Sequence, residues 1–144
     1  MIHLQNQEIE NSEIVLEGKE YQYLGPNLVL KNCRIVIRVS ARSLTITEVK
    51  FVGCQIDAKR KLINCQEWCR NSIRQCTFTG TYSGNDFGHW DSPLGELQDC
   101  DFSKAILDRC RMMDCDVKSI RFPRWPCFTV LQPGSALVGT GPIK

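Results

Sequence analysis

Apolar residues recur with a period of five in the C-terminal half of the chain. Residues 95–124 divide into six consecutive blocks of five, in which the first residue is small or apolar and the third is large and apolar. The first positions are Gly95, Cys100, Ala105, Cys110, Cys115 and Ile120, and the third positions are Leu97, Phe102, Leu107, Met112, Val117 and Phe122. An amphipathic helix needs apolar residues spaced by three and four, and a plain strand needs strict alternation, so neither explains this pattern. The period instead predicts a coil of short straight sides, with the first and third residues of each block pointing inward.

A longer repeat favours the same architecture along most of the chain. An apolar residue, a small residue three positions later and an apolar residue two positions after that occur together six times. The last members of this signature are Ile14, Ile35, Ile56, Phe78, Phe102 and Phe122, which step by 21, 21, 22, 24 and 20 residues. The steps predict about six coils, and those above 20 predict insertions at corners, which loops accommodate at small entropic cost.

The blocks resemble the pentapeptide-repeat family, in which the middle residue is typically Leu or Phe and the residue two before it is typically Ala or Cys. Residues 28–37 and 44–58 follow the same pattern, whereas residues 59–70 and 79–94 depart from it. The resemblance implies an all-β fold, a right-handed parallel β-helix of quadrilateral section. Stacked coils bury their inner residues only against their neighbours, so the coils are stable collectively.

The inward positions of successive coils predict the core. Free cysteine behaves as a small buried hydrophobe, so a cysteine at the small position is expected to pack rather than react. The predicted structural core comprises Cys33, Ile35, Cys54, Ile56, Cys76, Phe78, Cys100, Phe102, Ile120 and Phe122.

We expect one β-helix domain over residues 1–131. Terminal coils expose strand edges, so residues 1–8 are predicted to form an N-terminal cap and residues 123–131, which contain two prolines, a C-terminal cap. Residues 79–96 are rich in glycine and predict a loop insertion. The small-residue-rich segment 132–144 is expected to be a flexible tail.

Overall composition excludes several classes of partner. Eighteen lysines and arginines oppose 16 aspartates and glutamates, a formal charge of +2, so a nucleic-acid partner is not expected. No stretch approaches the ~18 apolar residues of a membrane-spanning helix. The first residues lack a basic start followed by an apolar run, so we expect a cytoplasmic protein whose nine cysteines are reduced.

The predicted insertion carries the best candidate contact patch. Tyr82, Phe87, His89 and Trp90 are predicted binding residues, because aromatic side chains on a protruding loop suit protein recognition. The alternative is that the loop folds back and covers the β-helix. His89 with Asp86 or Asp91 lacks an accompanying nucleophile or metal, so no catalytic residue is assigned.

The leading functional hypothesis is a non-enzymatic protein-binding scaffold without a cofactor or metal. One version is an immunity or antagonist protein that blocks a toxin or enzyme, which rests on resemblance alone. A DNA-mimicking, topoisomerase-protecting protein is an alternative that the near-neutral charge disfavours, although Trp125 and Phe128 could still mediate dimerisation through the C-terminal end; otherwise a monomer is expected. A metal-binding protein using Cys65, Cys69 and His89 is a third class.

Overall fold

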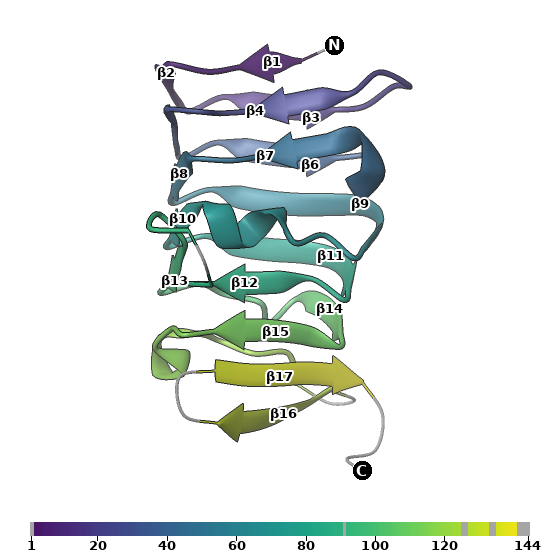
Figure 1. Ribbon diagram of the computed structural model, residues 1–144. Helices are drawn as coiled ribbons and strands as arrows, with labels where there is room; N and C mark the ends of the chain where they lie inside the picture. Colours follow the sequence, from purple (N-terminus) through teal and green to yellow (C-terminus); the bar gives the residue numbers. More distant parts are fainter. Residues whose placement is uncertain (1, 91, 125–126, 133–134, 141–144) are drawn as a thin grey trace.

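The chain winds into a stack of about five turns, in which each side of one turn lies against the same side of the next (Figure 1). This computed structural model describes residues 2–90, 92–124, 127–132 and 135–140, the side chains of 127–136 and 140 excepted. The predicted all-β parallel β-helix is thereby confirmed, with about five turns in place of the six expected.

Four sheets build the sides of the stack, and the first and the fourth lie on the same side, separated by residues 67–70 (Figure 1). The strand order in the first is β1 (His3–Leu4), β4 (Gln22–Leu24) and β7 (Leu44–Ile46). The second contains β2 (Gln7–Glu10), β5 (Leu28–Lys31), β8 (Val49–Val52), β10 (Ser72–Arg74) and β13 (Glu96–Gln98). The third contains β3 (Glu13–Leu16), β6 (Arg34–Ile37), β9 (Gln55–Ile63), β11 (Thr77–Ser83) and β14 (Ala105–Asp108). The fourth contains β12 (Asp86–Gly88), β15 (Cys110–Met113), β17 (Ser135–Thr140) and β16 (Cys127–Gln132).

Three short 3-10 helices interrupt the sheets: η1 (Ala41–Ser43), η2 (Glu67–Arg70) and η3 (Val117–Ser119). In the described part of the chain, no helix has the length and apolar character that crossing a bilayer requires. In the sixth predicted coil, Val117 begins η3 where a strand was expected, although its side chain still packs against the core. Beyond η3, the isolated bridge between Asp101 and Arg121 continues the parallel pairing.

Parallel pairing aligns the inward residues of successive coils. Ile14 pairs with Ile35, Ile35 with Ile56, and Ile56 with Phe78. The ring of Phe78 then stacks on that of Phe102, with centroids 4.5 Å apart and planes 9° apart. All of the predicted core residues are less than 9% exposed except Phe122, which is half-buried against the core. The interior is therefore one continuous column of apolar side chains.

A left-handed corner precedes the four cysteines that occupy the same position in successive coils. Residues with φ between 52° and 65° end each strand of the second sheet: Asn11, Asn32, Gly53, Gln75 and Asp99. Asparagine, aspartate and glycine adopt this conformation more readily than other residues, which suits them to the bend. The next residues are Ser12, Cys33, Cys54, Cys76 and Cys100. The four cysteines are each 1% exposed, so the bend turns a small side chain into the interior.

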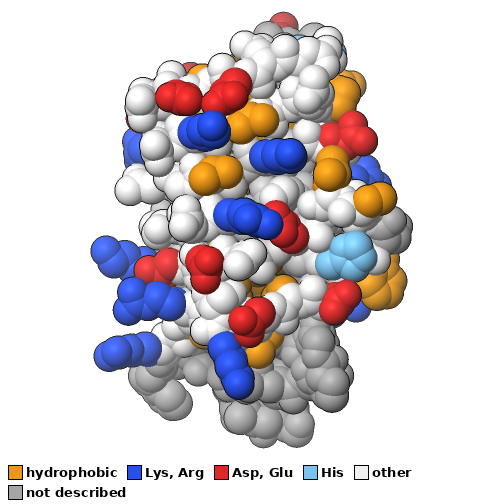
Figure 2. Space-filling view, turned by 90° about the vertical axis from the view of Figure 1, so that its left-hand side faces the viewer, with side chains coloured by type: hydrophobic (Ala, Val, Ile, Leu, Met, Phe, Trp, Pro, Cys, Tyr) orange, Lys and Arg blue, Asp and Glu red, His pale blue; other side chains and the backbone are white. Residues whose placement is uncertain are grey.

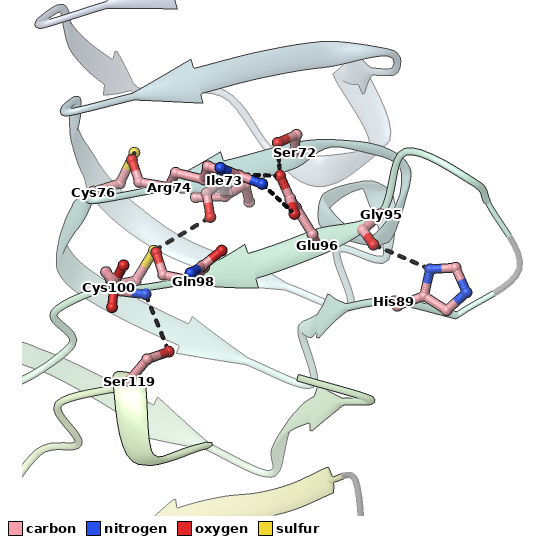
Figure 3. A network of polar contacts seen from close by, with 11 residues as sticks. Ser72, Ile73, Arg74, Cys76, His89, Gly95, Glu96, Gln98, Cys100 and Ser119 are labelled. Carbon is pink, nitrogen blue, oxygen red and sulfur yellow. Dashed lines mark hydrogen bonds and ion pairs between the residues drawn. The ribbon is translucent and has the colours of Figure 1, made fainter. Parts of the chain in front are cut away.

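The corners also join the coils through the backbone. The N–H groups of Asn32 and Gly53 donate to the carbonyls of Val52 and Arg74 at 2.9 and 3.0 Å, one coil further along the chain. The thiol of Cys100 donates to the Ile73 carbonyl at 3.6 Å (Figure 3). These bonds satisfy backbone groups that a bend would otherwise leave unpaired.

Charged residues on the outside form pairs between successive coils. Glu8 lies 2.7 Å from Lys31, and Glu96 accepts from both Arg74, at 2.7 Å, and the hydroxyl of Ser72 (Figure 3). Figure 2 shows acidic and basic side chains interspersed over this face. Exposed ion pairs of this kind contribute about 0–1 kcal/mol each to the free energy of unfolding, so the stacking depends mainly on the apolar core.

The two ends of the chain differ from the expected caps. Residues 3–4 and 7–10 are strands β1 and β2 of the first coil and do not form a separate cap. Residues 132–144 were expected to be a flexible tail, whereas Ser135–Thr140 form β17, which pairs antiparallel with β15 and β16. Antiparallel pairing of β17 with β15 and β16 thus follows the parallel stack (Figure 1). Trp125 and the side chain of Phe128, the predicted dimer contacts, lie outside the described residues.

Replacement of Phe78 by Ala tests the column directly. We expect Phe78→Ala to lower the free energy of unfolding by roughly 3–5 kcal/mol, because a fully buried ring is removed from a packed stack. The control is Ile106→Ala on β14, where a side chain 55% exposed is expected to change stability by no more than about 0.5 kcal/mol. Denaturant unfolding followed by circular dichroism measures both, and equal losses would contradict the inward assignment.

Candidate functional site

The candidate patch lies where the chain leaves β12 and returns to β13. The N–H of His89 donates to the Met113 carbonyl at 2.8 Å, and His89 Nδ1 lies 3.1 Å from the carbonyl oxygen of Gly95 (Figure 3). A Cβ on Gly95 would lie 2.2 Å from the backbone oxygen of Cys69, so only glycine allows this close return. Strand β12 ends at Gly88 and β13 begins at Glu96, so the connection is shorter than the predicted insertion at 79–96.

The predicted patch needs correction at Tyr82 and Phe87. Both side chains are 0% exposed, because they belong to strands β11 and β12 and point into the coil. The Tyr82 hydroxyl donates to the Thr79 carbonyl at 2.7 Å. Phe87 stacks on Trp68, with ring centroids 5.7 Å apart. These two residues stabilise the core and are unavailable to a partner.

Trp68 completes this aromatic block and anchors the irregular segment that follows β9. Its ring meets Phe78 edge-on at 5.6 Å, and its indole N–H donates to Asn85 Oδ1 at 3.0 Å. Asn85 is fully buried and donates to the carbonyls of Leu62 and Ser83 at 2.9 and 3.0 Å. Helix η2 is thus fixed against the core, and so are the residues on its outer side.

Trp90 is the member of the predicted patch that faces solvent. Its side chain is 64% exposed, whereas His89 is half-buried and occupied by its contact with Gly95. Trp90 borders a hollow of about 170 Å³ that η2, β12 and β15 line through Gln66, Cys69, Arg70, Asp86, Arg111 and Met113. An exposed indole therefore stands beside a small hollow with polar walls.

Asp86 and Arg111 hold one wall of the hollow in place. Arg111 donates from Nε and Nη2 to the two carboxylate oxygens of Asp86, both at 2.8 Å. These hydrogen bonds and the negative charge of Asp86 raise the pKa of the Arg111 guanidinium above its usual value. The Asp86 side chain is 9% exposed and that of Arg111 is 53% exposed, so the pair presents the cation to solvent. Because the pairing is bidentate, the guanidinium is already oriented before any partner arrives.

Cys65, Cys69 and His89, the residues of the metal-binding hypothesis, have different surroundings. Cys65 is 1% exposed, and burial raises the pKa of its thiol to about 12. Cys69 is 4% exposed and lines the hollow, while His89 contacts Gly95. Among the residues that the structure describes, no three or more His, Cys, Asp or Glu side chains form a group suited to a metal ion.

Sequence reasoning missed the two arginines of the hollow. Arg70 lies on the irregular η2 segment, and its guanidinium is 3.6 Å from Glu67. Arg111 and Asp86 stand 25 residues apart, about one coil, and this opposite-charge spacing is the signal that could have paired them. Asp101 and Arg121, 20 residues apart, form a comparable pair between coils, with charged atoms 3.8 Å apart.

No protein-family model, curated protein or solved structure matches this chain.

The buried cysteines are expected to resist alkylation in the folded protein. Burial raises the pKa of Cys100 and of Cys110 to about 11, so at a pH of about 8 both remain protonated thiols shielded from reagent. Half-buried Cys115 should react faster than either because reagent reaches it more easily. Iodoacetamide labelling with peptide mass spectrometry measures the three rates. Equal rates in native and denatured protein at Cys100 would contradict its burial.

Proposed function

We propose that this chain is a non-enzymatic protein-binding scaffold, built as a pentapeptide-repeat type of β-solenoid, that contacts its partner through Trp90 and the adjacent hollow. The five-residue period and the cysteines at small core positions support the pentapeptide-repeat assignment. Cysteines packed at small core positions suit a reducing compartment such as the cytoplasm.

One observation carries the proposal: an indole 64% exposed stands beside two arginines that line the same hollow. Tryptophan and arginine are over-represented among the residues that dominate binding energy at protein interfaces. Leaving a large aromatic side chain in water is unfavourable, and a partner surface that covers Trp90 would recover that free energy.

The size of the hollow favours a protein over a small molecule. Small-molecule sites are usually about 300–1,000 Å³, whereas this hollow is about 170 Å³, enough for one side chain of a partner. Its walls are already positioned by the Asp86–Arg111 pair and by η2, so little conformational entropy is lost on binding. The antagonist version of this role, in which the scaffold blocks a toxin or an enzyme, rests on the family resemblance.

Replacement of Trp90 by Ala tests the proposed contact. We expect Trp90→Ala to reduce recovery of the specific partner from native lysate at least about tenfold, because the central aromatic anchor is lost. Arg111→Ala is a poorer probe, since it would leave the buried Asp86 carboxylate unpaired and destabilise the fold.

The matched control is Ile106→Ala, which removes an exposed apolar side chain from β14 in another sheet. Quantitative mass spectrometry compares the amount of partner captured by the native chain, Trp90→Ala and Ile106→Ala. The proposal would be contradicted if Trp90→Ala captured as much partner as the native chain. It would also be contradicted if the Trp90→Ala and Ile106→Ala variants captured the same proteins in the same amounts.

A further inference from the structure

Strand β9 contains a bulge that breaks the regular coil. Ala58 pairs with Gly80 and Leu62 pairs with Tyr82, so three residues of β9, Lys59 to Lys61, face the single residue Thr81 of β11. The inward and outward alternation stops over this stretch, and all three basic side chains are exposed. Bulges redirect side chains at functional positions, so this one calls for a role beyond stacking.

Two residues of the bulge line a hollow of about 390 Å³ against the corner that contains η1. Arg60 and Lys61 form one side and Arg42 of η1 the other, with Ser40, Ala41, Ile63 and Asn64 completing the wall. The cations therefore come from segments about twenty residues apart that the stacking of coils brings together. We call this group the bulge hollow.

The three cations of the bulge hollow differ from Lys59 and Arg38 nearby in having no acidic partner among the described residues. Lys59 lies 2.9 Å from Asp57, and Arg38 lies 3.8 Å from Glu17. Arg42, Arg60 and Lys61 form no ion pair with any residue that the structure describes. Three like charges held around one hollow repel one another, and an anionic ligand would relieve that repulsion.

The surroundings favour a short acidic ligand over a long polyanion. Glu17, in the turn after β3, lies 3.8 Å from Arg38, two residues before Ser40 of the hollow. A long polyanion would need further unpaired cations, and three cations alone give weak phosphate binding. Ile63 is 53% exposed at the rim, so an apolar side chain of the ligand has a surface to cover.

We propose that the bulge hollow binds a short acidic segment of a partner protein, in which carboxylates pair with Arg42, Arg60 and Lys61 and an apolar residue packs on Ile63. The two guanidiniums suit bidentate pairing with carboxylates, and Ser40 and Asn64 add hydrogen-bonding groups at the wall. This site is separate from the Trp90 hollow, so the inference goes beyond the scaffold role proposed above.

Binding of a defined acidic peptide to the full chain tests the inference. The probe is a fluorescent peptide of about a dozen residues that repeats Glu-Glu-Leu, measured by anisotropy at low and high salt. We expect the triple variant Arg42→Gln, Arg60→Gln, Lys61→Gln to bind at least about tenfold more weakly than the native chain, as three lost exposed ion pairs imply. High salt should reduce the native affinity towards that of the variant.

A second triple variant controls for net charge. Lys50→Gln, Lys104→Gln, Lys118→Gln removes the same charge from other exposed positions and should keep nearly native affinity. Trp90→Ala should also bind the peptide normally, so failure of the Trp90 contact is distinguishable from failure here. Circular dichroism establishes that each variant is folded.

Three outcomes would overturn the inference. The first is absence of peptide binding to the native chain at low salt. The second is an equal loss in both triple variants, which would mean attraction by overall charge alone. The third is tighter binding of a single-stranded oligonucleotide of similar length, or of inorganic phosphate, than of the peptide.

Discussion

Parallel hydrogen bonding between successive coils in a fixed register is the constraint on which the rest of the structure depends. It places Ile35 on Ile56 and Ile56 on Phe78, so residues distant in sequence become neighbours in one apolar column. A shift of one residue in any coil would exchange the inner and outer faces, exposing the column and burying charge. The left-handed corners at Asn32 and Gly53 keep the register, because each turns the following cysteine inward and bonds to the next coil.

The period of five was sufficient to predict the fold class, because it reports which residues share the interior. Three of the corners had a signal as well: Cys33, Cys54 and Cys100 follow Asn32, Gly53 and Asp99, which tolerate positive φ, whereas Cys76 follows Gln75. The prediction of a long insertion at 79–96 was wrong because it took the glycines of this segment as markers of a loop. Gly80 and Gly88 have φ of +97° and +99° and lie against carbonyls of neighbouring coils, where a Cβ would clash. They mark close backbone approach between coils and not an extended loop, which is why Tyr82 and Phe87 are core.

The surface sites were harder to predict because they form where the repeat fails. The bulge at Lys59 to Lys61 and the helix η2 lie within residues 59–70, the stretch that departed from the pattern. The five-residue period predicts the position of a side chain only where the repeat is regular. Arg60 lies in the bulge and Arg70 in η2, so their positions depend on local backbone geometry that the period does not predict. The regular coils supply a rigid frame, and the irregular residues 59–70, from the bulge in β9 to η2, contribute side chains to both hollows.

Proton–proton contacts between adjacent strands test the coil register most directly. In isotope-labelled protein, nuclear Overhauser effects should connect the backbone protons of Ile35 with those of Ile56, and those of Ile56 with Phe78, as in a parallel sheet. Contacts displaced by one residue, or contacts that join these three residues to unrelated segments, would contradict the column and the two surface sites that it positions.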